Sequence, residues 1–209
     1  MSDDRASDRR ALVDRLRDRL DVTERTLAAI ESVPRHEFVP ARLQSRAYDD
    51  RPLPIGHDQT VSAPHMVAVM VDLLELRPGD RVFEVGTGCG YHAAVVAEIV
   101  GPGNVYSVEY VPALAESARE RLRRLGYEVT VEAGDGWEAF EDEPPFAAAY
   151  LTCAAPDDIP DPIVDRVGIG GRVVGPVADG RGQRLVRLQV TADGIEREDR
   201  GAVRFVPMR

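Results

Sequence analysis

The sequence predicts an α/β fold with a doubly wound, mostly parallel sheet in one domain of 209 residues. Three observations lead to this prediction. Short apolar strands alternate with helices from residue 81 to residue 177, as in a parallel sheet covered by helices on both faces. A glycine-rich turn joins the first of these strands to its helix. The segment 178–209 has strand-like alternation instead, which predicts antiparallel strands added to the sheet.

The first part, residues 1–55, is expected to be a helical extension. Residues 9–20 place Leu12 and Leu16 on one helical face. Thr23 is expected to cap a second short helix, because a threonine hydroxyl can accept a hydrogen bond from the first turn.

Residues 56–177 are expected to form a cofactor-binding core, and residues 178–209 a C-terminal β extension. In the extension, two strands should turn at Asp193-Gly194 as an antiparallel hairpin. The core strands are expected at residues 81–85, 104–109, 127–132, 147–152 and 171–177. The core helices are expected at residues 65–76, 91–100 and 113–125.

Composition favours a soluble, cytoplasmic protein. Hydrophobic residues make up 44% of the chain, which argues against disorder. The charged N-terminus lacks the apolar stretch of a signal peptide, and no apolar run is long enough to cross a bilayer. Cys89 and Cys153 have no zinc-ligand spacing, so we expect free thiols in a reducing compartment.

The charge of the chain is strongly acidic, with a net charge of −10, and all 26 basic residues are arginine. Such a surface disfavours nucleic acid as a partner, because phosphate binding needs clustered positive charge. Two explanations remain for the lack of lysine. The protein belongs to a halophile with a salt-rich cytoplasm, which is our hypothesis, or its genome is GC-rich.

The glycine-rich turn lies in VFEVGTGCGYHAA and contains Gly86, Gly88 and Gly90. Glycines here permit a tight turn and let a ligand approach the backbone. The spacing is not the GxGxxG of dinucleotide-binding proteins. Glu84 precedes the turn, and an acid beside it suits a cationic ligand better than a pyrophosphate.

Two further acids follow successive strands. Glu109 ends the second strand, where an acid can accept hydrogen bonds from ribose hydroxyls. Asp135, in the AGDGW turn after the third strand, can reach an adenine edge. Three acids at three strand ends beside a glycine loop predict a site for S-adenosylmethionine, whose sulfonium and ammonium groups are positive.

The segment 54–66, PIGHDQTVSAPHM, has no helical or strand period and is expected to be a loop. It holds two histidines and Ser62, so a hydrolase, a metal site or a substrate-positioning loop must be considered. The chain has no GxSxG elbow and no histidine pair with metal-ligand spacing, so no metal is expected. Ser62 can also be read as the N-cap of the following helix.

The run AYDDRPLPIGHDQTVSAPHM resembles the signature loop of protein-L-isoaspartate O-methyltransferases. The resemblance continues along most of the chain. VPRHEFVP resembles the family's N-terminal segment, VFEVGTGCGY its cofactor loop, GDG its adenine-site turn and LTCAAPDDIP its loop after the fourth strand. GGRVVGPV resembles its fifth strand, and VRFVPM its C-terminal strand.

The resemblance implies a class I S-adenosylmethionine-dependent methyltransferase fold of the Rossmann-like type. Family members methylate the α-carboxylate of L-isoaspartyl residues, and the ester then closes to a succinimide that opens partly to aspartate, which repairs the protein. The implied partners are isoaspartyl-containing proteins or peptides. We expect a monomer that binds neither nucleic acid nor membrane.

The resemblance also implies roles for residues. Ser62 matches the family's active-site serine and is expected to orient the substrate carboxylate, which is already ionised at neutral pH. The substrate wall is expected at Ala63, Pro64 and His65. The expected cofactor-binding residues are Thr60, Val61, Ser62, Glu84, Gly86, Thr87, Gly88, Cys89, Glu109, Asp135 and Gly136.

Some positions depart from the family pattern, among them Asp58, Ala147 and Cys153. These departures keep two alternatives open. The chain is a methyltransferase of the same fold for another carboxylate or small molecule, or it is a non-catalytic cofactor-binding paralogue. Trp137, directly after the GDG turn, is expected either to pack on adenine or to fill the core.

Overall fold

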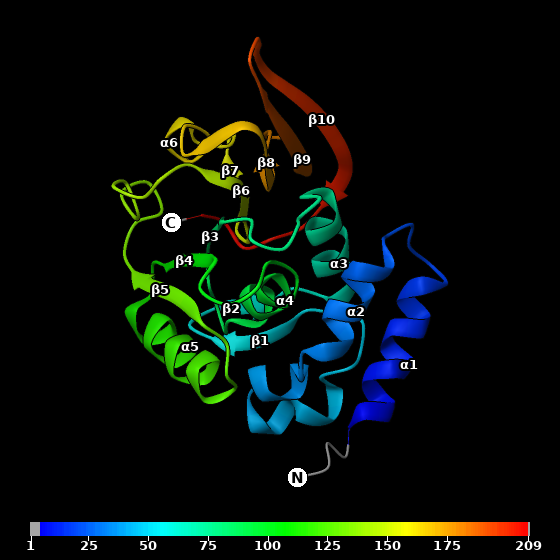
Figure 1. Ribbon diagram of the computed structural model, residues 1–209. Helices are drawn as coiled ribbons and strands as arrows, with labels where there is room; N and C mark the ends of the chain where they lie inside the picture. The colour runs from blue at the N-terminus through cyan, green and yellow to red at the C-terminus, as the bar shows by residue number, and fades with distance from the viewer. Residues whose placement is uncertain (1–4, 209) are drawn as a thin grey trace.

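The computed structural model describes residues 5–208 (Figure 1). The predicted N-terminal extension begins at residue 1, so residues 1–4 of it lie outside the described residues, as does residue 209 of the predicted C-terminal extension. The main sheet has the strand order β10-β9-β8-β6-β3-β4-β5, and β7 pairs with β8 beside this path. Its strands are β3 (Val82–Val85), β4 (Val105–Glu109), β5 (Val129–Ala133), β6 (Phe146–Leu151), β7 (Ala155–Pro156), β8 (Val167–Ala178), β9 (Gln183–Thr191) and β10 (Gly194–Val203).

The predicted doubly wound sheet is confirmed. Strands β8, β6, β3, β4 and β5 pair in parallel, while β9 and β10 add antiparallel pairs. The order of the chain reverses beside β3, which has β4 on one side and β6 on the other. Open α/β sheets bind their ligands at such a switch point, outside the carboxyl ends of the strands.

Helices and apolar side chains cover both faces of the sheet. One core joins the N-terminal helices, α3, α4 and part of α5 to one face, and a second core joins α6 and the segment around Phe140 to the other. The helices are α1 (Ala6–Arg17), α2 (Glu24–Ser32), α3 (Pro64–Leu73), α4 (Tyr91–Val100), α5 (Pro112–Arg124), α6 (Asp161–Val164) and the 3₁₀ turns η1 (Arg35–Phe38) and η2 (Ala41–Arg46).

The predicted helix cap at Thr23 is confirmed. Its hydroxyl accepts a hydrogen bond from Thr26 N at 3.4 Å, at the start of α2. Asp72 on α3 accepts hydrogen bonds from Thr23 N and from Thr26 Oγ1, both at 2.8 Å. The cap therefore also fastens α2 to the helix that follows the signature loop.

Two predicted strand boundaries shift for local reasons. The third core strand was expected from residue 127, but β5 begins at Val129, because Tyr127 N donates to Leu122 O at 2.9 Å and closes the end of α5. The fifth core strand was expected from residue 171, but β8 begins at Val167, which pairs with Phe146 before an irregularity in the register.

The signature loop is not irregular, so that expectation is corrected. It forms an antiparallel hairpin of β1 (Leu53–Gly56) and β2 (Gln59–Val61), in which Leu53 pairs with Val61. His57 and Asp58 form the turn with φ of 53° and 59°. Left-handed residues at a two-residue turn match the twist of the flanking strands. The hairpin is short and carries prolines, which hid it from a periodicity argument.

The C-terminal strand expected at 203–208 is also corrected. The strand β10 ends at Val203, and the tail then leaves the hairpin and crosses back to the end of β6 (Figure 1). There Ala154 N donates to Val206 O at 2.7 Å, and Met208 N donates to Ala154 O at 2.8 Å. Gln183 holds the start of the tail, because it accepts from Phe205 N at 2.6 Å.

None of the described helices combines the length and the apolar character that a membrane span requires.

Candidate active site

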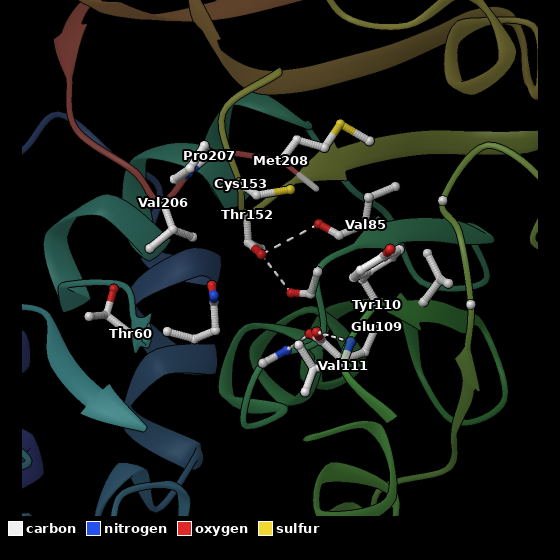
Figure 2. Close-up of a pocket in the computed structure, with 16 residues that line it drawn as sticks. Thr60, Val85, Glu109, Tyr110, Val111, Thr152, Cys153, Val206, Pro207 and Met208 are labelled. Carbon is white, nitrogen blue, oxygen red and sulfur yellow. Dashed lines mark hydrogen bonds between the residues drawn. The ribbon is translucent and has the colours of Figure 1, made fainter. Parts of the chain in front are cut away.

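A pocket of about 630 Å³ lies at the carboxyl ends of β3, β4 and β6 (Figure 2). The glycine loop, the turn after β5 and the C-terminal tail enclose it. Its lining residues are Gln59, Thr60, Val85, Gly86, Gly88, Val108, Glu109, Tyr110, Val111, Gly134, Gly136, Thr152, Cys153, Val206, Pro207 and Met208.

Glu109 is held by backbone groups on the floor of this pocket. Its Oε2 accepts from Gly88 N at 2.8 Å, and its Oε1 accepts from Val111 N at 2.9 Å (Figure 2). The side chain is only 6% exposed. A carboxylate has about four acceptor positions, so both oxygens retain lone pairs for a ligand. A pair of vicinal hydroxyls fits this arrangement.

Two glycines of the pocket wall, one in the glycine loop and one in the turn after β5, are packed so closely that a side chain is excluded. A Cβ at Gly86, whose φ is +98°, would lie 2.4 Å from Thr152 Oγ1. That hydroxyl donates to Gly86 O at 2.5 Å (Figure 2). A Cβ at Gly136 would lie 2.7 Å from Val85 Cγ1. At both positions glycine therefore lets the backbone pack directly against a side chain of a neighbouring strand end.

A smaller cavity of about 300 Å³ lies between the β1–β2 hairpin and the start of α4. It shares Thr60, Gly86, Gly88 and Thr152 with the larger pocket, so the two spaces adjoin. Its other lining residues are Val61, Ser62, Val67, Thr87, Cys89, Tyr91 and His92. Nine of the predicted site residues thus line one or both spaces: Thr60, Val61, Ser62, Gly86, Thr87, Gly88, Cys89, Glu109 and Gly136.

Ser62 is half-buried at the entrance to α3, facing the small cavity. The alternative reading of Ser62 as the helix N-cap is wrong. The N-cap is Ala63, which makes no side-chain capping hydrogen bond, and the first helical residue is Pro64. Proline at this position needs no hydrogen bond for its nitrogen. The hydroxyl of Ser62 is therefore left for a ligand.

Glu84 does not reach either cavity, so it cannot contact a ligand there. The side chain is fully buried and lines neither cavity. Ser107 Oγ donates to its Oε2 at 2.5 Å, and Tyr150 OH donates to its Oε1 at 2.8 Å. Burial raises the pKa of Glu84 to about 8 against the effect of these hydrogen bonds. The expected direct contact with a cationic ligand is thus corrected to a position beneath the glycine loop.

Asp135 is placed beside the pocket instead of in its wall. It is exposed, and its Oδ1 accepts from Trp137 N at 2.9 Å, which stabilises the turn after β5. The neighbouring Gly134 and Gly136 line the pocket, and Asp135 does not. The exposed fraction of Trp137 is 49%, so it does not fill the core. The structure therefore gives Asp135 the role of shaping the turn.

The residues expected at the substrate wall line neither cavity. Ala63 and Pro64 are buried at the start of α3, and neither they nor His65 line the two cavities. His65 is 39% exposed, and its Nδ1 lies 2.8 Å from Asp50 Oδ1, which also accepts from His65 N at 2.9 Å. Asp50 was not among the expected site residues, and it fixes the orientation of this imidazole.

Both cysteines are free, as expected. Cys89 lines the small cavity and Cys153 the large one. Burial, together with the negative charge of Glu109, raises the pKa of Cys153 to about 12. The thiol therefore stays protonated and offers no nucleophile at neutral pH.

Several lining residues were missed by sequence reasoning. Gln59 and Thr152 flank the glycine loop, and Tyr110 follows Glu109 directly. The tail residues Val206, Pro207 and Met208 reach the pocket only through the tertiary path described above. The VRFVPM resemblance marked the tail as characteristic, but no local signal placed it at the site.

The lining residues fit S-adenosylmethionine. No arginine lines either cavity within residues 5–208, so a pyrophosphate would lack a counter-charge, whereas a sulfonium would not. Glu109 has free lone pairs that could accept from ribose hydroxyls, and the glycines leave backbone open to a ligand. Within the same residues, no cluster of histidine, cysteine or acidic side chains could hold a metal ion.

Comparisons with known proteins agree with this site. Residues 7–209 match the family described as Protein-L-isoaspartate(D-aspartate) O-methyltransferase (PCMT). Protein-L-isoaspartate O-methyltransferase 2 of Archaeoglobus fulgidus is 50% identical, over 96% of this chain and 92% of the relative. Protein-L-isoaspartate O-methyltransferase of Methanothermobacter thermautotrophicus is 49% identical, over 96% of this chain and 94% of the relative.

Solved structures give the same result. A protein-L-isoaspartate O-methyltransferase superposes with a TM-score of 0.87 at 28% identity, covering 96% of this chain and 66% of that longer chain. A Plasmodium falciparum protein, solved with S-adenosyl-L-homocysteine, has a TM-score of 0.82 at 23% identity and supports the fold. By family match, sequence identity and pocket geometry, this chain belongs to the protein-L-isoaspartate O-methyltransferase family.

Proposed function

We propose that in this S-adenosylmethionine-dependent protein-L-isoaspartate methyltransferase Glu109 and the glycine loop bind the cofactor. Ser62 orients the substrate carboxylate. The single observation that carries this proposal is the junction of the two cavities at Thr60, Gly86, Gly88 and Thr152. A ligand anchored at Glu109 can extend past these residues toward Ser62. One chain thus offers adjoining places for a nucleoside and for a carboxylate.

Glu109 would hold the ribose hydroxyls, and the backbone of Gly86 and Gly88 would face the amino-acid part of the cofactor. Gly134 and Gly136 would border the adenine, beside Tyr110. When bound, the cofactor supplies an electrophilic methyl group on a positively charged sulfur. The protein does not need to generate a nucleophile, since the substrate carboxylate is ionised at neutral pH.

Ser62 would donate a hydrogen bond to the incoming carboxylate and fix its direction of approach. Placement of this kind can supply a large part of a rate enhancement, because it removes the entropy of finding the reacting geometry. The raised pKa of Cys153 keeps a neutral thiol in the pocket wall. The substrate carboxylate therefore meets no competing anion from that side chain.

The function is tested by methyl transfer from labelled S-adenosylmethionine to an isoaspartyl peptide, beside the matched aspartyl peptide. We expect base-labile label on the isoaspartyl peptide alone. Equal label on both peptides would contradict the specificity. Label on a small carboxylate but on neither peptide would favour the second candidate function, a methyltransferase for another substrate, which the exposed Asp58 at the hairpin tip motivates.

We further propose a monomeric, cytoplasmic protein of a halophile that binds neither nucleic acid nor membrane. The net charge of −10 without lysine supports this reading, because counterions must screen the repulsion among the acids. A thermal melt in dilute buffer and in molar KCl tests it. We expect the midpoint to rise with salt, and an unchanged midpoint would leave a GC-rich genome as the explanation.

A further inference from the structure

A buried chain of hydrogen-bonded side chains connects the end of β3 to the glycine loop. Ser107 Oγ donates to Glu84 Oε2 at 2.5 Å, and the hydroxyls of Ser107 and Thr87 lie 2.5 Å apart. On its other side, the Glu84 carboxyl accepts from Tyr150 OH at 2.8 Å. All four side chains are buried. Of the four, Thr87 alone lines the cavity that contains Ser62.

The direction of this chain depends on one proton, because each hydroxyl has a single hydrogen to donate. When Glu84 is ionised, Ser107 donates to it, Thr87 donates to Ser107, and Thr87 keeps only an acceptor for the cavity. When Glu84 carries a proton on Oε2, it donates to Ser107 and Ser107 donates to Thr87. The hydrogen of Thr87 is then free for the cavity.

We propose that Glu84 is a positioning residue that acts on the cofactor site through Ser107 and Thr87, so that cofactor binding and the protonation of Glu84 are coupled. A bound sulfonium cofactor favours an acceptor at Thr87 and hence an ionised Glu84. The inference rests on the proposed S-adenosylmethionine site and not on the identity of the methyl acceptor. By linkage, binding then releases a proton, and rising pH strengthens binding.

The surroundings of Glu84 bring the pKa of its carboxyl close to neutral pH. Burial raises the pKa of Glu84 to about 8, the hydrogen bonds from Ser107 and Tyr150 lower it, and the charge of Glu109 on β4 raises it. His92 on α4 packs against Tyr150, with ring centroids 4.4 Å apart and ring planes tilted by 37°. Burial lowers the pKa of His92 to about 3, so it stays neutral near pH 7. Glu84 is therefore the group in this cluster that can change charge there.

Isothermal titration calorimetry in two buffers of different ionisation heat measures the protons released on binding. The titrant is S-adenosylmethionine, between pH 6.5 and 8.5. If binding lowers the pKa of Glu84 by about one unit, wild type should release roughly half a proton from this group near pH 7.5. S-adenosylhomocysteine has no sulfonium and should release less. The cofactor's own amino group cancels when variants are compared with wild type.

Three variants distinguish coupling through the hydrogen-bonded side chains from a through-space effect of the charge on Glu84. Glu84→Gln should lose the release. Ser107→Ala keeps the acid but cuts the path to Thr87, and it should lose most of the release as well. Tyr150→Phe removes the other donor and leaves that path intact, so its release should persist with a maximum at higher pH.

Two outcomes would overturn the proposal. Wild-type release in Ser107→Ala would mean that Glu84 senses the ligand through space alone. Wild-type release in Glu84→Gln would mean that another group titrates. If Glu84→Gln does not fold, the comparison of Ser107→Ala with Tyr150→Phe decides. The readout is binding, so inactivity on isoaspartyl peptides would leave this test intact.

Discussion

Replacing Glu109 by alanine tests how the pocket holds its cofactor. The substitution removes both oxygens that accept from Gly88 N and Val111 N, and it removes the proposed ribose acceptors. Hydrogen bonds to a charged group contribute about 1.5–3 kcal/mol each. Loss of two ribose bonds should therefore cost about 3 kcal/mol or more of binding free energy, which weakens affinity roughly a hundredfold.

The free energy of unfolding should fall by less than the free energy of cofactor binding. The two backbone N–H groups lose their partner, but the pocket admits water, so we expect about 1 kcal/mol for each, the lower end of the usual range. Calorimetry with S-adenosylhomocysteine measures the affinity, and urea unfolding measures the stability. Glu132→Ala is the matched control, because Glu132 is exposed on the neighbouring strand β5, and it should change neither quantity much.

Affinity within about twofold of wild type in a folded Glu109→Ala protein would refute the placement of the ribose. A loss of affinity in Glu132→Ala of the same size would also refute it, because the effect would then come from the general charge of the surface.

Two further predictions concern Ser62 and Glu84. Ser62→Ala should lower kcat about tenfold to a hundredfold while S-adenosylhomocysteine affinity changes less than about threefold, since one hydrogen bond to the carboxylate is lost; equal losses in both quantities would mark Ser62 as a cofactor residue. For stability, the pKa of Glu84 is raised to about 8 in the fold from an ordinary value of 4.5, so its contribution is present below pH 4.5 and is lost as pH rises through 8. Wild type should lose about 2 kcal/mol from this group between pH 5.5 and pH 7.5, and Glu84→Gln should flatten that slope in urea unfolding; equal slopes in both proteins would contradict the burial of the carboxyl.

The parallel core could be predicted because its local signals agree with its packing. Strand β3 is fully buried and, apart from Glu84, apolar; the glycine loop follows it, and α4 is apolar around most of its surface. Glu109 could be placed as well, because a residue at the carboxyl end of a parallel strand faces the switch point wherever the sheet forms. Strand-end reasoning did not place Ser62. Only the family resemblance predicted that it lies at the site.

The remaining features depend on contacts distant in sequence. Glu84 and Glu109 both precede turns at strand ends, but Glu84 meets Tyr150 and Ser107 inside the sheet, whereas Glu109 meets the open pocket. No pattern within the strand separates the two acids. The tail reaches the pocket because Ala154 pairs with residues Val206 and Met208, about fifty positions later. Such pairings appear only in three dimensions.

The central claim is that this chain repairs isoaspartyl damage by methyl transfer to a substrate carboxylate that Ser62 orients. The direct measurement is a chromatographic time course of an isoaspartyl peptide with the protein and S-adenosylmethionine, in molar KCl. We predict that the isoaspartyl peptide declines while succinimide and the aspartyl peptide accumulate, and that Ser62→Ala slows this conversion. An isoaspartyl peptide that stays unchanged while the protein binds its cofactor would contradict the claim.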